Sequence, residues 1–381
     1  MTIINRGLAG PARRLRTVAA AGAAALAMAA VGAATAQAST ADPAGRGPGS
    51  GSTTAHGAIR PDLLSFAGFE AVFVATDGHL RSIDPNNTLE DHGPNLIVGS
   101  PNSVALADDP IAGFSEIFRS DENGGEMFQG NNSGFHQFGQ TADANTTPAI
   151  GFTLEGDEEI AWASLGRLMV VNGDVNGGTP ALEGGIRANT SPAVAASSIG
   201  IDEFFLAWVD QNGVLNYDDG TGVHTIVTAT AQGSGQQVDA HVQPGTSPAV
   251  ATSGRNWDIA WQDTNGHLVE AASPDGSGAA ELTQTVVGSP SLTALSTGAF
   301  VSASENPNGD LFVGGVDEHQ SVEQGNNPAI AADNKGGWKI VFEGPDLFMH
   351  SIDSSGSTHT FNQVHVSSDA SPAITTLFSD N

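Results

Sequence analysis

The sharpest candidate for chemistry in this 381-residue chain is a run of oxygen-bearing side chains between Asn172 and Glu183. With Asn172 as position 1, Asp174 is at position 3, Asn176 at position 5 and Glu183 at position 12, with a glycine at position 6. This spacing matches the oxygen ligands of a calcium loop, in which the glycine permits a sharp turn. Because position 1 is Asn and the flanking segments read as strands, a plain turn is the alternative. Calcium is the one cofactor that the sequence suggests.

Two tryptophans and two histidines are the candidates for ligand contact. Trp257 and Trp338 lie four residues before a repeated aromatic position. An indole that reaches an open groove can stack on the C–H face of a sugar, and packing between sheets is the alternative. His79 and His267 each lie between a turn glycine and a leucine. A neutral imidazole there could bond a hydroxyl group or a metal ion, and simple solvation at a turn tip is the alternative.

The charge balance is strongly acidic, with 13 Lys and Arg against 42 Asp and Glu and a net charge of -29. Such a field repels phosphate backbones and anionic lipid, so nucleic acid and acidic membrane surfaces are not expected as partners. The chain has no Cys, which excludes disulfide scaffolds and thiolate metal clusters. Gly and Pro together fall below the ~25–30% that marks disordered low-complexity chains, so a folded protein is expected.

Residues 1–38 resemble a secretory signal peptide. Four arginines precede an Ala-rich apolar stretch that ends in Ala36-Gln37-Ala38, a small-x-small cleavage pattern. Arg16 occupies a place where a twin-arginine signal would have an apolar residue, which favours the general secretory route. Residues 39–61 offer little to bury and predict a disordered linker. The sequence therefore predicts a secreted, extracellular protein without membrane insertion, whose folded domain spans residues 62–381.

The rest of the chain repeats the phrase Ser/Thr-Pro-Ala-aliphatic. Its prolines are Pro148, Pro192, Pro248, Pro328 and Pro372, with looser copies at Pro101 and Pro290. These spacings are close to the ~40–50 residues of known propeller blades.

Two further positions recur after each proline. The first is aromatic, with one exception: Phe118, Trp162, Trp208, Trp261, Phe342 and, as the exception, Ala303. The second is a large aliphatic residue: Met127, Leu168, Leu215, Leu268, Leu311 and Leu347. The turn formers between them predict β-hairpins, and the alternation of Trp257, Ile259 and Trp261 has the period of two of a strand. The aromatic column is expected to fill the space between neighbouring sheets, and the fold is expected to be all-β.

The two ends of the folded region complement each other. Pro372 begins a seventh copy that stops before its aromatic position, whereas the hairpin around Phe73 and Leu80 has no Ser-Pro-Ala strand before it. Joining the two would complete one blade and close a ring, which removes exposed sheet edges. The prediction is a seven-bladed β-propeller closed by its N- and C-terminal segments, with the small Pro-Ala strands nearest the axis. An open linear array is the alternative.

The segments TSPAVATSGRNWDIAWQDTNGHL and TSPAVAASSIGIDEFFLAWVDQNGVL resemble repeats of secreted actinobacterial propellers and blades of seven-bladed bacterial fucose-binding lectins. The resemblance covers residues 69–381. It implies a propeller fold and glycan binding between blades. Those lectins usually carry a further aromatic residue just after the leucine, whereas this chain has mostly other residues there.

No catalytic residue is assigned. The chain has no Gly-x-Ser-x-Gly, His-Glu-x-x-His or phosphate-binding glycine loop. Its densest acidic run, Glu155, Asp157, Glu158 and Glu159, is expected on a solvated surface. The leading hypothesis is a secreted binding module for an extracellular glycan or polysaccharide. The alternatives are a propeller glycan hydrolase or lyase with funnel carboxylates, and an adhesion or scaffold protein.

Overall fold

Every described element of the computed structural model is a β-strand. The structure describes residues 64–95, 104–109, 113–120, 124–131, 134–153, 156–172, 181–196, 204–226, 229–230, 237–238, 240–254, 256–272, 280–368 and 370–380, all within the compact unit Ala55–Asn381. The predicted signal peptide (1–38) and linker (39–61) lie outside the described residues. No described segment forms a helix that is long and apolar enough to cross a bilayer.

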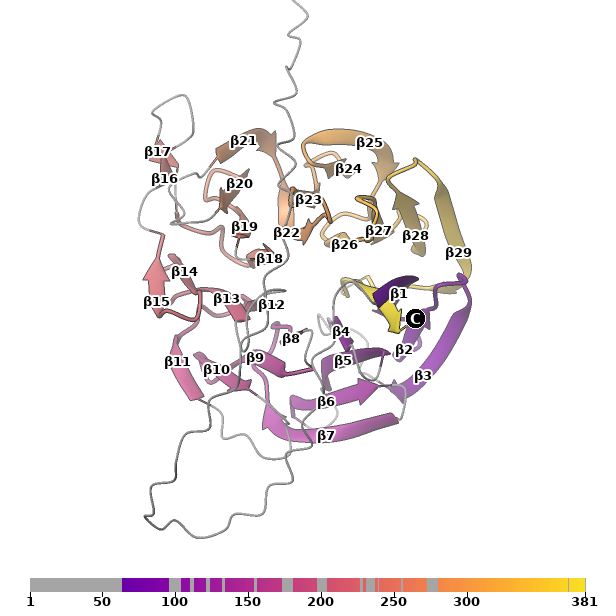
Figure 1. Ribbon diagram of the computed structural model, residues 1–381, viewed down its shortest axis with the longest axis horizontal. Helices are drawn as coiled ribbons and strands as arrows, with labels where there is room; N and C mark the ends of the chain where they lie inside the picture. Colours follow the sequence, from indigo (N-terminus) through magenta and orange to yellow (C-terminus); the bar gives the residue numbers. More distant parts are fainter. Residues whose placement is uncertain are drawn as a thin grey trace, which may run out of the picture. The chain divides into compact units, whose positions relative to one another are not determined.

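Seven four-stranded antiparallel sheets are arranged as the blades of a ring (Figure 1). From the axis outward, blade 1 consists of β30 (Ala373–Asp380), β1 (Leu64–Val74), β2 (His79–Ile83) and β3 (Leu89–Asn95). Blade 2 consists of β4 (Val104–Asp109), β5 (Gly113–Ser120), β6 (Glu126–Asn131) and β7 (Gly134–Thr141). Blade 3 consists of β8 (Ala149–Phe152), β9 (Glu158–Ser164), β10 (Arg167–Asn172) and β11 (Ala181–Gly185). Blade 4 consists of β12 (Ala193–Ala196), β13 (Phe204–Val209), β14 (Leu215–Asp218) and β15 (Val223–Thr225).

The last three blades follow the same order. Blade 5 consists of β18 (Ala249–Ser253), β19 (Asn256–Gln262), β20 (His267–Ala272) and β21 (Ala280–Thr285). Blade 6 consists of β22 (Val287–Ala294), β23 (Phe300–Glu305), β24 (Asp310–Val313) and β25 (Val316–Ser321). Blade 7 consists of β26 (Ala329–Ala332), β27 (Trp338–Glu343), β28 (Phe348–Asp353) and β29 (Thr358–His365). A short hairpin of β16 (Ala229–Thr230) and β17 (Gln237–Val238) lies between blades 4 and 5 in the chain.

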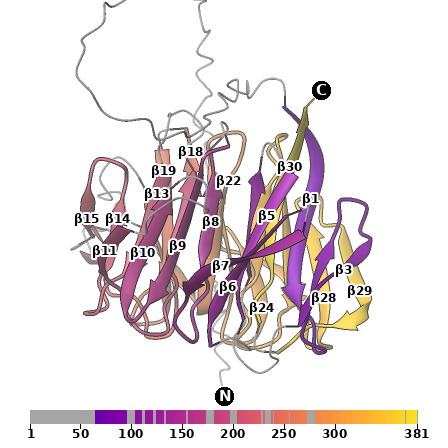
Figure 2. The same cartoon turned by 90° about the horizontal axis from the view of Figure 1, so that it is seen from below.

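The ring closes in blade 1, as the sequence predicted. The C-terminal strand β30 pairs with β1 in antiparallel register, with Ala71 opposite Ile374 and Val72 opposite Ala373 (Figure 2). The all-β fold, the count of seven blades and the closure by the two ends are therefore confirmed. Pairing the two ends in one sheet gives β1 a neighbouring strand on both sides and leaves β30 at the axis, where the other blades also place their first strand.

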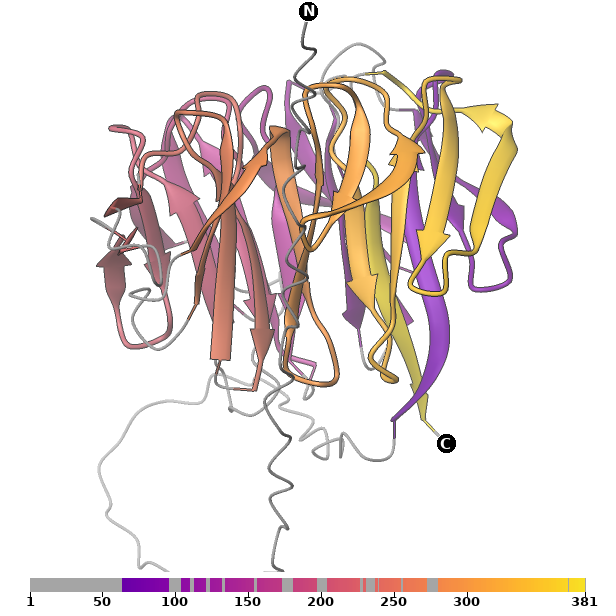
Figure 3. The ribbon, with the colours of Figure 1, turned by 90° about the horizontal axis from the view of Figure 1, so that it is seen from above.

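The Pro-Ala strands are the innermost strands of the blades, and each contacts the innermost strands of the two neighbouring blades. Figure 3 shows the ring of blades from its side. Small residues suit this place because seven strands converge there. The register gives every inner strand an equivalent position, which we call the alanine ring. Its members are Ala105, Ala149, Ala193, Ala249, Ser291, Ala329 and Ala373.

The repeated aromatic position forms the core between blades. Phe73, Phe118, Trp162, Trp208, Trp261 and Phe342 are all at most 3% exposed. Each packs with apolar side chains of an adjacent blade, as Trp162 does with Ile117 and Met127 of blade 2. The predicted role of this column is confirmed for these residues.

The register corrects three positions of the predicted repeat. Ala105 pairs with Ile117 as Ala149 pairs with Ala161. Val104 therefore holds the proline position of blade 2, and the looser copy at Pro101, which lies outside the described residues, is out of register. The predicted position was wrong because the inner strand of blade 2 has no proline to mark the repeat.

The other two corrections concern blades 6 and 7. Glu305 pairs with Leu311, so Ser304 and not Ala303 holds the aromatic position of blade 6, while Ala303 packs toward blade 7. Glu343 pairs with Met349, which is fully buried and fills the aliphatic position predicted for Leu347. Leu347 instead lies in the turn with a φ of 63° and is 37% exposed.

The closure yields a test because the chain has no cysteine. We expect the double variant Ala71→Cys/Ile374→Cys to form a disulfide on mild oxidation, because the two residues are opposite each other in β1 and β30. The bond would close a very long loop and raise the free energy of unfolding by about 2–4 kcal/mol. A mobility shift on non-reducing gels and the melting temperature measure these effects.

The matched control is Ala71→Cys/Thr375→Cys, in which the second cysteine would point to the opposite face of the sheet. A disulfide that forms as readily in this control, or in neither variant, would contradict the β1–β30 register.

Candidate functional site: the axial cavity

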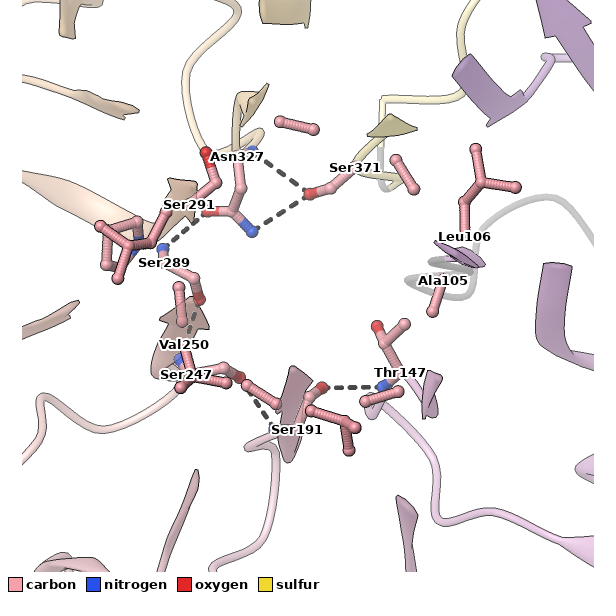
Figure 4. Close-up of a pocket in the computed structure, with 18 of the residues that line it drawn as sticks. Ala105, Leu106, Thr147, Ser191, Ser247, Val250, Ser289, Ser291, Asn327 and Ser371 are labelled. Carbon is pink, nitrogen blue, oxygen red and sulfur yellow. Dashed lines mark hydrogen bonds between the residues drawn. The ribbon is translucent and has the colours of Figure 1, made fainter. Parts of the chain in front are cut away.

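A ring of hydrogen bonds joins six consecutive blades around the axis (Figure 4). The backbone N–H of Thr147 donates to Ser191 Oγ at 2.8 Å, that of Ser191 to Ser247 Oγ at 2.8 Å, and that of Ser247 to Ser289 Oγ at 2.8 Å. Asn327 continues the ring, since its Oδ1 accepts from the Ser289 N–H at 2.7 Å. The hydroxyl ring, as we call it, consists of Thr147, Ser191, Ser247, Ser289, Asn327 and Ser371.

Asn327 also links blade 7 to blade 1. Its backbone N–H and its side-chain amide donate to Ser371 Oγ at 3.2 and 3.1 Å. The residue before each proline thus forms a hydrogen bond to the neighbouring blade. Because buried N–H groups must find acceptors, this position favours a short side chain with an oxygen.

The hydroxyl ring borders a polar mouth with a volume of about 540 Å³. Asn145 and Asn189 lie at its rim with φ values of 59° and 58°, and Gly245 and Gly325 lie at equivalent places with φ values of 83° and 95°. Asn and Gly are the residues that adopt this left-handed conformation most readily. The two asparagines bond each other, Asn145 Nδ2 donating to Asn189 Oδ1 at 3.1 Å.

Beneath the hydroxyl ring the wall becomes apolar. This part, which we call the tube, is lined by the proline position, the alanine ring and the aliphatic residue that follows it in each inner strand. Together with the hydroxyl ring it encloses a volume of about 320 Å³. The aliphatic residues are Leu106, Ile150, Val194, Val250, Leu292, Ile330 and Ile374.

The hydrogen-bonding groups of the mouth carry no charge, and they can both donate and accept. Each serine of the ring that accepts a backbone N–H still has its own O–H proton to donate and a further lone pair. The rim adds amide groups, which both donate and accept. The mouth and the tube share the hydroxyl ring, so they form one axial cavity with a polar end and an apolar end.

None of the described residues that line this cavity is acidic or basic. Glycoside hydrolysis usually needs a pair of carboxyl groups at a set separation. The predicted funnel carboxylates of a hydrolase or lyase therefore have no support in the described wall of the cavity.

The two predicted tryptophans lie between blades and outside the axial cavity. Trp257 is 5% exposed and packs against Phe205 and Tyr217, with ring centroids 4.8 Å away in both cases. Trp338 is half-buried against the core between blades 6 and 7. Packing accounts for most of their surface, and ligand contact by either stays a prediction.

The two predicted histidines occupy equivalent places in blades 1 and 5. His79 Nδ1 lies 3.1 Å from Asp91 Oδ2, and its side chain is 35% exposed. His267 Nδ1 lies 3.8 Å from Asp263 Oδ2, and its side chain is 34% exposed. Both are partly covered and next to carboxylates, and they belong to different blades. The structure does not bring the four predicted ligand residues together, and their role in binding stays a prediction.

Most of the predicted calcium loop cannot be placed. Asn172 ends β10 and Glu183 lies within β11, so both belong to strands of blade 3. Asp174 and Asn176 lie outside the described residues. No group of three Asp, Glu or His side chains that could hold a metal ion occurs among the described residues. Calcium stays a prediction.

The acidic run in blade 3 is only partly on the surface. Asp157 is exposed, but Glu158 and Glu159 are 7% and 6% exposed. Glu158 accepts a hydrogen bond from the side-chain amide of Gln129 in blade 2. The prediction of a solvated surface was wrong for these two glutamates because β9 begins at Glu158 and carries them into the sheet.

Other carboxyl groups are also buried between blades. Burial raises the pKa of Glu116 in β5 to about 8, and the nearby Glu70 carboxyl adds to the shift. Burial likewise raises the pKa of Glu70 in β1 to about 7. In blade 5, burial and then the neighbouring Glu270 raise the pKa of Asp258 to about 7. These groups are held substantially protonated near neutral pH.

The sequence pattern missed the hydroxyl ring. Its signal was present, because Ser, Thr or Asn precedes the proline in every copy at Pro148, Pro192, Pro248, Pro290, Pro328 and Pro372. The sequence analysis used that residue only to recognise the repeat and assigned it no role in binding.

The buried carboxyl groups predict that stability decreases as pH rises. A carboxyl group whose folded pKa is raised contributes stability that is complete below its unfolded pKa, near 4.5, and is lost as pH passes the folded pKa. We expect the melting temperature to fall between pH 5 and pH 8.5. For Glu116→Gln we expect a flatter profile and a gain of about 2–4 kcal/mol at pH 8.5 relative to the parent chain.

Thermal melting across this pH range is the measurement. Glu318→Gln, on the outermost strand of blade 6, is the control and should keep the slope of the parent chain. An equal slope for Glu116→Gln and the parent would show that this carboxyl group does not titrate between pH 5 and pH 8.5.

No known protein family matches the sequence, and no curated protein matches it. Among solved structures, the chain is similar to SapL1 lectin in complex with alpha methyl fucoside, with 13% identity, a TM-score of 0.47, and 71% of this chain and 97% of that chain covered. It is similar to the Aleuria aurantia lectin, described as a six-bladed β-propeller, with 12% identity, a TM-score of 0.43 and coverage of 81% and 97%. It is also similar to AofleA from Arthrobotrys oligospora, with 10% identity, a TM-score of 0.45 and coverage of 73% and 90%. The assignment of seven blades rests on the strand pairing of this chain.

Proposed function

We propose that this protein is an exported, lectin-like binding module that takes a neutral glycan in the mouth of its axial cavity. The observation that carries the proposal is the chemistry of the wall. Hydroxyl and amide groups from several blades converge on one cavity of about 540 Å³, within the size range of ligand sites, and no charged side chain is among its described lining. A sugar hydroxyl both donates and accepts hydrogen bonds, which matches this wall.

Charge favours a neutral ligand over an anionic one. The chain has a net charge of -29, and the described wall offers no cation to pair with a carboxylate or sulfate group. Export is part of the proposal and is supported by the signal-like residues 1–38. The sequence resemblance to fucose-binding lectins supports a glycan as the ligand class.

The test is a glycan array with the mature chain, followed by calorimetry on any glycan retained. We expect neutral glycans to bind and uronic or sialylated glycans to bind more weakly. The neutral set should include fucosylated glycans, because the SapL1 structure holds alpha methyl fucoside. Retention of no glycan at any concentration would overturn the proposal, and release of shortened products from a polysaccharide would favour the hydrolase or lyase instead.

The rim asparagines provide a variant that removes ligand contacts without straining the backbone. We expect Asn145→Gly/Asn189→Gly to weaken glycan binding by about 10- to 100-fold, because two side-chain amides are lost. Glycine tolerates the positive φ of both positions, so folding should be kept.

Asn87→Gly is the matched control. Asn87 has a φ of 61° and lies in the outer hairpin of blade 1, away from the axial wall. Equal binding by both variants and the parent chain would place the glycan outside the mouth.

A further inference from the structure

The axial cavity changes character along its length, and only its mouth is explained by a glycan. Below the hydroxyl ring, the tube is built from proline, alanine and aliphatic side chains. Proline has no backbone N–H, and the alanine and aliphatic side chains offer no polar atom. These side chains offer water no hydrogen-bond partner, so an apolar group in contact with them is stabilised.

The alanine ring keeps the tube open. Most of its alanines are half-buried, and they line the cavity. A larger residue at this position would fill the space where the seven inner strands converge. The small side chains therefore leave a passage, lined by apolar side chains, that begins at the hydroxyl ring.

One member of the alanine ring is polar. Ser291 replaces alanine in blade 6, and its Oγ is buried without a hydrogen-bond partner. A buried hydroxyl group without a partner is destabilising. Because this oxygen is buried, it adds no polar group to the surface that the tube presents to a ligand.

We propose that the ligand is a neutral amphiphile, with a hydroxyl-rich head in the mouth and an alkyl chain in the tube. The inference rests on the proposed function, because the sugar is the head group. It goes beyond that function by naming an alkyl-linked glycan, such as the head of a glycolipid or an alkyl glycoside, as the ligand class. A single ligand per chain follows, because there is one axis.

The chemistry of both ends selects this class. A free hydrocarbon would leave the amides and hydroxyl groups of the mouth to water, and a plain oligosaccharide would leave the tube filled with water. A fatty acid would bring a carboxylate to a mouth whose described lining holds no cation. A neutral head with an alkyl chain satisfies both parts.

The experiment compares methyl and octyl glycosides of β-D-glucose, β-D-galactose and α-L-fucose by calorimetry, below the concentration at which the octyl compounds form micelles. We expect the octyl compound of the preferred sugar to bind on the order of 10- to 100-fold more tightly than the methyl compound, because several methylene groups leave water. The stoichiometry should be one per chain. Equal affinity of the two compounds would overturn the inference and leave the proposed function standing.

Two variants separate tube binding from adsorption to the surface. Ala329→Leu should reduce the preference for the octyl over the methyl glycoside at least about fivefold by filling the tube. Ala193→Val adds less volume at the equivalent position of blade 4, and it should reduce the same preference about twofold or more. Val316→Ala, at an exposed site on β25, is the control and should not change this preference.

The outcomes remain distinguishable if Ala329→Leu fails to fold, because Ala193→Val adds less bulk. An unchanged preference for the octyl glycoside in Ala193→Val, with folding intact, would contradict an alkyl group in the tube. Octyl tetraethylene glycol ether tests the head group. Tight binding of this ether at one per chain, with no binding of any methyl glycoside, would support the tube and overturn the glycan proposal.

Discussion

The structure depends on the convergence of seven strands at one axis. Each inner strand must carry small side chains, and the backbone N–H groups that it turns toward the next blade must find hydrogen-bond acceptors. The repeat meets both needs within three residues. The hydroxyl group of Ser191 or Ser247 accepts an N–H of the preceding blade, the proline needs no acceptor, and the alanine leaves room. Blades 4 to 7 and blade 1 each supply the acceptor for the blade before them, so a chain of equivalent bonds joins six of the seven blades, and the composite blade 1 takes its place in it through Ser371.

The same constraint creates the cavity. If larger residues filled the axis, the inner strands would be forced apart, and the aromatic core between blades would lose contact. Small residues therefore leave a passage, and the hydroxyl ring that joins the blades forms its polar part. A cavity with one polar and one apolar end follows from how the ring is assembled, and it needs no residues set aside for binding. The rim residues Asn145 and Asn189 lie in loops outside the inner strands, so a change there that keeps the positive φ leaves the blades in place.

The architecture could be predicted from the sequence because proline, aromatic and aliphatic residues recur at nearly constant spacing. Errors arose where one marker was missing. Blade 6 has Ser304 at the aromatic position, so the nearest apolar residue, Ala303, was taken instead, although a shift of one residue turns a side chain to the other face. The candidate site was harder to predict. Its groups are ordinary serines and asparagines, whose importance comes from the convergence of six blades on one axis, whereas the conspicuous Trp257 is largely used in packing.

The spaces between blades differ from one another in chemistry, which bears on where a ligand binds. Three residues before the aromatic position, blade 1 has Glu70, blade 4 has Phe205 and blade 5 has Asp258, all buried. Arg255 is the only Lys or Arg between Arg187 and Lys335, so carboxyl groups such as Asp258 rely largely on protons for neutralisation. Interfaces this different cannot form seven equivalent pockets. The axis is the one place to which all blades contribute similar groups, and a repeated sequence therefore favours one central site over a ring of peripheral ones.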